Sequence, residues 1–296
     1  MGDYHVHLHP HGQHGTAELP MGQYPPGHID AFVASAAARG WSEVGFTEHL
    51  YRCVESIGVL GRFWEGDPAR AAAEQTASWV PSDQALSLER YVEAVTSARD
   101  RGLPVLLGLE VDFFPNTIGA VLELIDPYPW DVLIGSVHWV GAWSVDHPDG
   151  AAEFDRRGVR TAYEDYFELE TSLAASGAVD VLAHADVVKK FGHRPLDVPA
   201  DLYAPVVAAA AASGTAVEVS TGGLHEPAAE LYPAEPFLAM FHDAGVPITL
   251  ASDAHHPDQC ARDFDVAVAA ARGAGYTERL RFRKRVAETV PLEQPG

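Results

Sequence analysis

The 296-residue sequence contains very little lysine, which occurs only as Lys189, Lys190 and Lys284. With 42 acidic residues against 20 lysines and arginines, the formal net charge is −22 at pH 7. A surface this acidic is a poor partner for the phosphate backbone of nucleic acid and for an anionic membrane. We therefore expect no nucleic-acid partner and no membrane partner.

Cysteine and long apolar runs are also scarce. The two cysteines, Cys53 and Cys260, exclude a disulfide framework and a thiolate zinc site, and they favour a reducing cytoplasm. The sequence has no charged-then-apolar leader and no apolar run of about 18 residues, so we expect no signal peptide and no membrane span. The glycine-rich phosphate loop of dinucleotide-binding folds is absent after the first expected strand.

Short apolar segments alternate with amphipathic segments along the whole chain. Strands are expected near 3–8, 43–47, 104–109, 131–137, 179–183, 215–220 and 247–251. Helices are expected near 28–39, 88–101, 161–175, 199–213 and 234–244, with a short helix from Asn116 as its cap to Ile125, and two more helices after the last strand. Such alternation is typical of a parallel sheet covered on both faces, and seven units in one run favour a closed barrel.

The length is compatible with one barrel-sized domain or two smaller ones. We interpret residues 1–296 as a single domain, because no linker, repeat or low-complexity tract divides the chain. Residues 50–87 are expected to be irregular and to form an inserted loop over one rim of the barrel.

The N-terminal segment 3–11 contains four of the fifteen histidines. His5 and His7 are two residues apart on an expected strand, so their imidazoles face the same side. Two imidazoles aimed at one point are what a divalent metal requires. Taken alone, the pattern fits a histidine-rich tract or a buried histidine pair equally well.

Further side chains that can bind metal occur where later strands end. Six of them follow this rule: His49, Glu110, His138, His184, Asp253 and His255. The carboxyl ends of barrel strands meet at one rim, where the active sites of such barrels are built. The pattern indicates a multi-metal hydrolase, and nitrogen and oxygen donors without sulfur suit zinc, manganese or iron.

Six short motifs add a resemblance to a known family. They are Asp-Tyr-His-Val-His at 3–7, Gly-Phe-Thr-Glu-His at 45–49, Gly-Leu-Glu-Val-Asp at 108–112, Gly-Ser-Val-His-Trp at 135–139, Leu-Ala-His-Ala-Asp at 182–186 and Ala-Ser-Asp-Ala-His at 251–255. In this order and spacing the chain resembles the PHP (polymerase and histidinol phosphatase) superfamily, and most of all its stand-alone histidinol-phosphate phosphatase branch. The resemblance implies a distorted seven-stranded (β/α)7 TIM-like barrel with a trinuclear metal centre.

Carried over by position, the resemblance implies three metal sites. The first takes His5, His7, Glu110 and Asp253; the second shares Glu110 and adds His138 and His184; the third takes His49, His255 and one ligand from the loop after the first strand. His11 in Pro10-His11-Gly12 is the expected loop ligand, with His14 and His9 as alternatives, because this loop is shorter than in relatives. Two to three divalent transition metals are therefore expected.

The implied chemistry is hydrolysis of a phosphomonoester. Two cations that share a carboxylate can hold a hydroxide near neutral pH, which would attack phosphorus in line without a covalent enzyme intermediate. Glu110, Asp253 and His255 would then be catalytic through the metals that they bind. Four acids either orient the imidazoles or are ordinary surface and capping acids: Asp3, Glu48, Asp112 and Asp186.

The basic side chains that grip phosphate in relatives are only partly present. Lys190 lies after the fifth strand, where relatives tend to carry a basic residue, although a solvated lysine is the alternative. After the sixth strand, His225 stands where relatives often have arginine. Arg52, with Arg62 and Trp64, is an expected substrate contact from the rim loop. The basic residues at 279–285 are interpreted as the solvated face of a last helix.

Together these expectations describe a histidinol-phosphate phosphatase, which converts L-histidinol phosphate and water to L-histidinol and phosphate in histidine biosynthesis. One alternative is a PHP phosphoesterase that acts on nucleotides or oligonucleotide ends. Another is a metal-binding module without activity. We expect a cytoplasmic monomer or small homo-oligomer with a small phosphorylated substrate.

Overall fold

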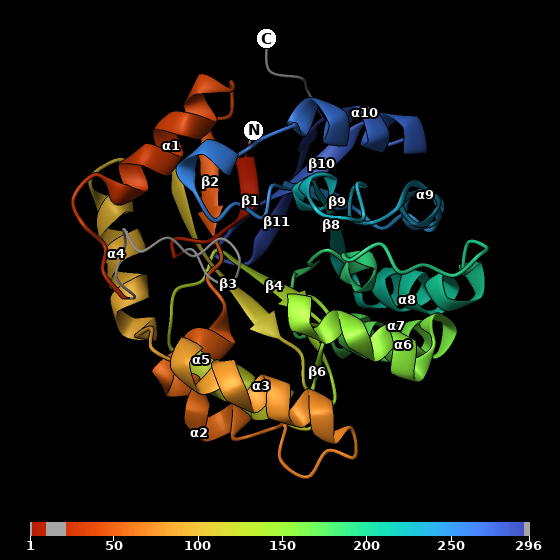
Figure 1. Cartoon of the computed structure of the whole chain (residues 1–296). Coiled ribbons are helices and arrows are strands. Elements are labelled where there is room, and N and C mark those ends of the chain that lie inside the picture. Colours follow the sequence, from red (N-terminus) through yellow and green to blue (C-terminus); the bar gives the residue numbers. More distant parts are fainter. Residues whose placement is uncertain (1, 10–21, 293–296) are drawn as a thin grey trace.

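A computed structural model describes residues 2–9 and 22–292 of the chain. Seven parallel strands form one sheet that curves into a nearly closed barrel (Figure 1). Around the barrel they follow their order in the chain: β1 (Gly2–Val6), β2 (Glu43–Phe46), β3 (Val105–Asp112), β4 (Val132–Ser136), β7 (Val181–Leu182), β8 (Ala216–Ser220) and β9 (Ile248–Ala251). The two edge strands meet where the His7 N–H donates to the Ala254 carbonyl at 2.7 Å. The expected seven-stranded barrel is confirmed.

Helices surround the barrel and bury one face each against the strands (Figure 1). They are α1 (His28–Ala38), α4 (Leu88–Asp100), α5 (Ile118–Ile125), α7 (Val159–Ser176), α8 (Ala200–Ser213), α9 (Glu235–Asp243) and α10 (Phe264–Ala274), with the short α6 (Glu153–Arg157) before α7. In α4, Leu88, Tyr91 and Val95 recur at helical spacing and are buried, and the Ser87 side chain accepts the Arg90 N–H at the N-terminus. The alternation of strand and helix therefore follows the hydrophobic period of the sequence.

The helix after β3 begins differently from our expectation. α5 begins at Ile118, and Thr117 is the residue before it. No side chain caps this end, so the prediction that Asn116 caps the helix is wrong.

The segment between β2 and α4 is more regular than predicted. It contains α2 (Ile57–Leu60), α3 (Arg70–Asp83) and two three-residue 3₁₀ turns, at Leu50–Arg52 and Val54–Ser56. α3 packs on the two-residue strands β5 (Trp139–Val140) and β6 (Trp143–Ser144), where the Thr76 hydroxyl donates to the Ala142 carbonyl at 2.7 Å. The alanine-rich start of α3 is a good helix former, a signal that the prediction of an irregular segment missed.

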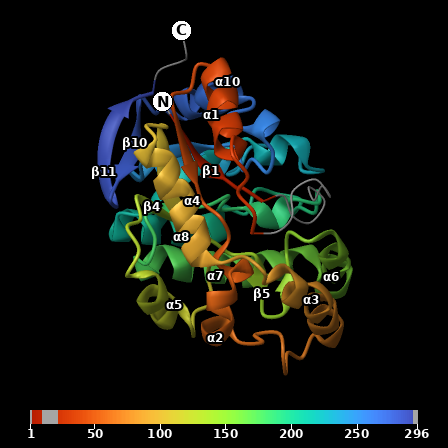
Figure 2. The same ribbon diagram turned by 90° about the vertical axis from the view of Figure 1, so that its left-hand side faces the viewer.

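The described part of the chain after α10 forms a β-hairpin and not the second helix that we expected. After α10, β10 (Glu278–Arg283) pairs antiparallel with β11 (Val286–Pro291), at the left of the view in Figure 2. Leu280 and Phe282 are buried together with side chains of the barrel interior: Tyr4, Leu106, Val132, Ile134, Val181, Ala183 and Ala216. The hairpin therefore closes the N-terminal end of the barrel.

Basic residues of the hairpin hold it to the loops that precede the strands. Arg285 pairs with Asp180 at 3.0 Å, and Arg283 pairs with Glu43. The Lys284 N–H donates to Asp131 Oδ1 at 3.1 Å. The interpretation of residues 279–285 as a solvated helix face is therefore wrong, because alternate residues of this segment point into the barrel.

Two predictions concern the chain as a whole. In the part that the structure describes, no helix combines the length and the apolar composition that crossing a membrane requires. That residues 1–296 form a single domain stays a prediction.

The contribution of the hairpin side chains that close the N-terminal end of the barrel can be tested by truncating one of them. Phe282 is 3% exposed, so Phe282→Ala should lower the free energy of unfolding by about 3–5 kcal/mol. Val286 in the same hairpin is 68% exposed, and Val286→Ala should change it by less than about 0.5 kcal/mol. Urea unfolding of both variants measures the difference, and equal effects would contradict this contribution of Phe282.

Candidate metal centre

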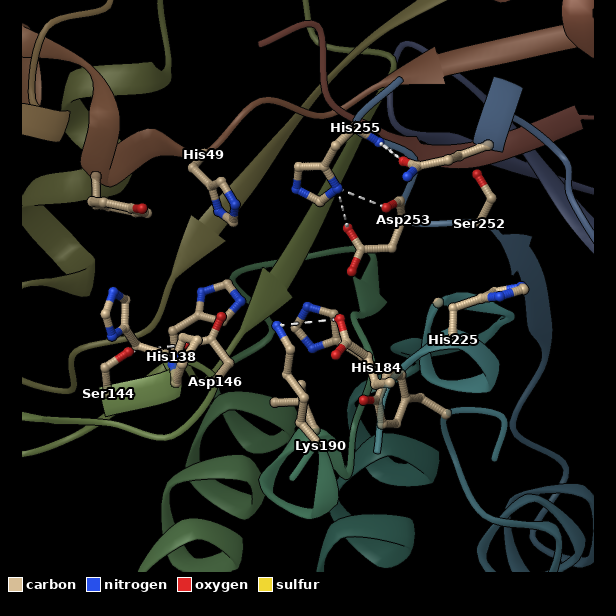
Figure 3. Close-up of a pocket in the computed structure, with 18 of the residues that line it drawn as sticks. His49, His138, Ser144, Asp146, His184, Lys190, His225, Ser252, Asp253 and His255 are labelled. Atoms are coloured by element: carbon tan, nitrogen blue, oxygen red, sulfur yellow. Dashed lines mark hydrogen bonds and ion pairs between the residues drawn. The ribbon is translucent and has the colours of Figure 1, made fainter. Parts of the chain in front are cut away.

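The expected ligands in the described residues gather at the C-terminal end of the barrel. Figure 3 shows those that line a pocket: His49, His138, His184, Asp253 and His255. His5 lies on β1 and His7 follows it, Glu110 lies on β3, and the others follow β2, β4, β7 and β9: His49, His138, His184, Asp253 and His255. All except Asp253 are buried. The topology of a parallel barrel therefore brings together residues that span 250 positions of the chain.

Donor atoms of four expected ligands of the first metal lie near one another. The Nε2 atoms of His5 and His7 are 3.1 Å apart. Glu110 Oε2 lies 3.4 Å from the first and 3.6 Å from the second, and Asp253 Oδ1 lies 3.4 and 3.2 Å from them. Ligand atoms held tetrahedrally at about 2.0 Å from a zinc-like ion are spaced by about 3.3 Å. His5, His7 and Glu110 form a group whose donor atoms can serve one divalent ion, and Asp253 lies beside the two imidazoles of that group.

The second oxygen of Glu110 faces two other imidazoles. Oε1 lies 3.1 Å from His184 Nε2 and 3.4 Å from His138 Nε2. Because one carboxylate offers a different oxygen to each group of imidazoles, it can be shared between two metal ions.

His49 and His255 complete the cluster around His7. Each of their rings stacks on the His7 ring at a centroid distance of 4.4 Å. One donor atom from each of these three residues can serve a single ion. His49 Nδ1 also lies 2.7 Å from Glu110 Oε2. With Glu110 and His138, His49 forms a second group of donors that can hold an ion. The geometry brings the expected third-site pair together and leaves the sharing of His49 open.

Carboxylates hold several of these imidazoles by the nitrogen that faces away from the cluster. His5 Nδ1 lies 3.0 Å from Glu218 Oε2, and His138 Nδ1 lies 2.8 Å from Asp112 Oδ1. Contacts of this kind fix the tautomer and leave Nε2 as the ligand atom.

Two further histidines are oriented in a similar way. His7 Nδ1 lies 3.5 Å from Glu48 Oε1, a long contact. His255 Nδ1 donates to the Asp253 carbonyl at 2.8 Å, which again leaves Nε2 for a ligand.

Of the four acids proposed from the sequence, Glu48 and Asp112 contact an imidazole. Asp3 instead accepts the N–H groups of Ser252 and Ala261, at 3.0 and 2.8 Å. Asp186 pairs with the Lys189 ammonium at 2.8 Å. These two carboxylates hold loops at the rim and do not orient imidazoles.

The prediction missed Glu218, although the sequence contains a signal for it. Glu218 lies in the middle of β8, a strand of apolar and small residues, and it is 1% exposed. Besides holding His5, its Oε1 accepts the His184 N–H at 2.7 Å. An acid inside a fully buried strand needs such partners.

The charges of the cluster are mutually dependent. Burial alone would raise the pKa of Glu110, but the imidazoles of His49, His5 and His138 outweigh it and hold that pKa well below its ordinary value. Burial likewise opposes protonation of His5, yet Glu218, Glu110 and Asp253 raise its pKa well above the ordinary value. The site therefore favours positive charge at its centre, as a metal cation would supply.

Backbone strain marks two of the ligands. His184 and Asp253 have positive φ angles of 27° and 54°, in a region that residues other than glycine rarely occupy. Strain of this kind collects at functional sites, where the surrounding structure holds it.

The loop ligand lies partly outside the described residues. His11 and His14 belong to the undescribed segment, so the assignment of His11 stays a prediction. His9 is described, and its Nε2 lies 3.0 Å from the Gln23 carbonyl. That contact turns His9 away from the cluster and does not favour it as the ligand.

A pocket of about 300 Å³ opens above the cluster. Lys190 and His225 line it, as expected from the sequence (Figure 3). It is also lined by residues that the sequence did not single out as site residues: Trp79, Asp83, Asp146, Gln259 and Arg262.

The expected contacts from the rim segment do not reach this pocket. Arg52 is 1% exposed, and its Nη1 donates to Glu48 Oε1 and the His9 carbonyl, at 3.3 and 3.1 Å. Arg62 pairs with Glu65, and Trp64 is buried. We correct the prediction for Arg52 because its guanidinium supports Glu48 from below the metal cluster.

Comparisons with known proteins agree with this geometry. The PHP domain family matches residues 3–222. A "Probable histidinol-phosphatase" from Deinococcus radiodurans is 34% identical over 266 residues, which is 90% of this chain and 95% of that protein. The chain belongs to the PHP domain family.

Solved structures show that the PHP fold extends over nearly the whole chain. The histidinol phosphate phosphatase of Lactococcus lactis, solved with zinc, L-histidinol and phosphate, superposes with a TM-score of 0.71 at 21% identity and covers 97% of this chain and 98% of its own. The putative histidinol phosphatase of Listeria monocytogenes gives a TM-score of 0.71 at 17% identity, with 90% and 99% covered. At these identities the likeness establishes the fold of this PHP protein.

The role of Glu218 in the PHP metal centre can be tested by Glu218→Gln. The amide keeps the size of the side chain but removes the charge that holds His5 Nδ1, so zinc affinity should fall about 10- to 100-fold. Competition with a chromogenic chelator measures it. Glu168→Gln, on the exposed face of α7, removes one charge elsewhere and should leave zinc affinity unchanged. Equal affinities for the two variants would contradict the role of Glu218.

Proposed function

We propose that this PHP protein is a metal-dependent histidinol-phosphate phosphatase. The observation that carries the proposal is the placement of Glu110, which presents one oxygen to each of two groups of imidazoles beneath a pocket. The Deinococcus radiodurans relative, at 34% identity over most of both chains, bears the name of this activity. Hydrolysis of L-histidinol phosphate to L-histidinol and phosphate is the reaction that both observations support.

We propose the metal ligands that the sequence predicts. His5, His7, Glu110 and Asp253 would hold one ion, His138 and His184 a second one that shares Glu110, and His49, His255 and His11 a third. Bound divalent ions supply Lewis acidity and an activated water molecule for attack on phosphorus. We propose two to three ions of zinc, manganese or iron, and the zinc in the Lactococcus lactis structure supports the first of these metals.

The protein's own residues position the metals and the substrate. Glu218, Asp112 and Glu48 keep the imidazoles in the orientation that leaves Nε2 free for a ligand. Glu110 and Asp253 stay ionised, because neighbouring imidazoles lower their pKa values despite burial. The site is thus ready to bind cations before any substrate arrives.

The pocket has the polarity that a cationic phosphomonoester requires. Asp146 and Ser144 lie beside His138, whereas His225 lies toward the opposite side, with Lys190 between them (Figure 3). Asp83 and Asp146 line the pocket, where their carboxylates could pair with an ammonium group. Lys190, whose Nζ lies 3.8 Å from Glu226 Oε1, would contribute a point charge to phosphate binding.

The alternatives fit these observations less well. The net charge of −22 does not favour nucleotide polymers. A module that only binds metal would need the donors but not the pocket that opens above them. The cytoplasmic location remains a prediction, with which the two buried free cysteines are compatible. The monomeric or small homo-oligomeric state also remains a prediction.

A phosphate-release screen of metal-loaded protein tests the proposed function. L-histidinol phosphate, nucleoside monophosphates and a 5′-phosphorylated oligonucleotide should be compared at equal concentration. We expect kcat/KM for histidinol phosphate to exceed the others at least about tenfold. Of the compounds compared, it is the one with an ammonium group that can pair with the carboxylates of the pocket. Preference for a nucleotide would support the alternative phosphoesterase, and no release from any substrate would support the inactive module.

The shared carboxylate gives a separate prediction about metal content. Elemental analysis of protein purified without chelator should find about two to three transition-metal ions per chain. Glu110→Gln should lose at least one of these ions and reduce phosphatase activity about 100-fold or more, because the bridge loses its charge. Glu168→Gln serves as the control for charge. Unchanged metal content and turnover in Glu110→Gln would refute the bridge.

A further inference from the structure

The expected basic contacts of the pocket offer little unpaired positive charge to a phosphomonoester beside the metal centre. Lys190 Nζ lies 3.8 Å from the Glu226 carboxylate, which offsets part of its charge. His225 stands where relatives often have arginine, and its Nε2 lies 2.6 Å from Asp263 Oδ2. In Figure 3 the His225 ring lies at the edge of the pocket, apart from the histidine cluster. Neither side chain is an unpaired cation that faces the metals.

Arg262 meets the need that these two leave open. It is the only arginine among the described residues that line the pocket. Its Nε lies 3.8 Å from Asp263 Oδ2, and its terminal nitrogens make no hydrogen bond to any described residue. Burial lowers the pKa of Arg262, and Asp263 offsets this only in part, so the guanidinium would gain from an anion in the pocket.

The backbone around Arg262 is held in an unusual conformation. Ala261 and Asp263, on either side, have φ angles of 56° and 58°, in the left-handed region. The Ala261 N–H donates to the buried Asp3 carboxylate at 2.8 Å, and the Arg262 carbonyl accepts the Thr221 hydroxyl at 2.8 Å. Contacts from two different strand ends thus fix a strained turn whose middle residue lines the pocket, a pattern typical of a functional position.

The same contacts join this turn to the metal centre. Asp3, which holds Ala261, also accepts from the N–H and hydroxyl of Ser252, the residue before Asp253. Gln259 Oε1 accepts the His255 N–H at 2.7 Å. The loop that carries Arg262 is therefore tied to the segments of two expected ligands, and this fixes the backbone of Arg262 beside the metal centre.

We propose that Arg262 grips the substrate phosphate in this chain, in place of the arginine that relatives often carry at the position of His225. The planar guanidinium donates in a fork that matches two phosphate oxygens, whereas a lysine supplies only a point charge. His225 then acts as a positioning residue through Asp263. The inference rests on the proposed function in one respect, namely that the anion is the phosphate of a small substrate.

Phosphate affinity and steady-state kinetics of the metal-loaded protein test the proposal. Arg262→Ala should raise both the KM for L-histidinol phosphate and the inhibition constant for inorganic phosphate about 10- to 100-fold, with metal content unchanged. Arg262→Lys should give an intermediate value for both. Arg101→Ala, which removes an exposed arginine paired with Asp30, should behave as wild type. The side chain of Arg262 is 36% exposed, so its loss should leave the melting temperature unchanged.

Calorimetric titration with inorganic phosphate separates this inference from the proposed function. If wild type does not hydrolyse histidinol phosphate but binds phosphate about 10- to 100-fold more tightly than Arg262→Ala, the grip stands and the substrate assignment fails. If wild type is active and Arg262→Ala binds phosphate within about twofold of it, the grip is overturned and the function stands. Should the alanine variant unfold, Arg262→Gln takes its place, and its phosphate affinity is compared with that of wild type by the same limits of about 10- to 100-fold and about twofold.

Discussion

The rest of the site depends on one buried carboxylate. Glu110 lies in the middle of the barrel rim, is 0% exposed and has no lysine or arginine partner among the described residues. A carboxylate in such a place is stable only if positive charge surrounds it closely. Imidazoles from β1, β2, β4 and β7 provide that charge, and a metal ion on each side of the carboxylate would provide it more fully. The requirements of Glu110 explain why histidines stand at the ends of so many strands.

This arrangement also explains the second layer of acids. Each imidazole that faces the cluster through Nε2 has its other nitrogen available, and a buried N–H without a partner is costly. Glu218, Asp112 and Glu48 provide that partner from other strands of the barrel, and Arg52 in turn pairs with Glu48. Chemistry is thus concentrated at the C-terminal rim. The other end of the barrel is closed by Leu280 and Phe282, which contribute apolar packing. The division follows the general plan of barrels, in which one face carries function and the other stability.

Much of this could be predicted from the sequence because it depends on periodicity. The strands and helices follow hydrophobic repeats, and parallel strands place their ends together, so His49, Glu110, His138 and His184 could be grouped without coordinates. Arg52 could not be placed correctly, since its burial depends on Glu48 and the His9 carbonyl, which no local pattern reveals. The hairpin was missed although Arg279 to Arg283 alternate with Leu280 and Phe282 at a period of two, because charged residues obscured the strand pattern. Glu218 was missed as a site residue because its partners, His5 on β1 and His184 after β7, are distant from it in the sequence.

The net charge finally explains why the phosphate has to be held at short range. At −22 the protein repels a phosphomonoester dianion at long distance, so its field gives no help in capture. Attraction must come from cations within a few ångströms, where a partly buried setting strengthens them and salt screens them little. Metal ions bound by Glu110 would fulfil that condition beneath the pocket. A guanidinium that lines the pocket from a strained turn, as Arg262 does, would fulfil it at the wall. Lysines on flexible stems would meet it less well, and only Lys190 of the three lines the pocket. The scarcity of lysine is therefore compatible with phosphate binding, because the attraction comes from a few cations inside the pocket of an otherwise acidic molecule.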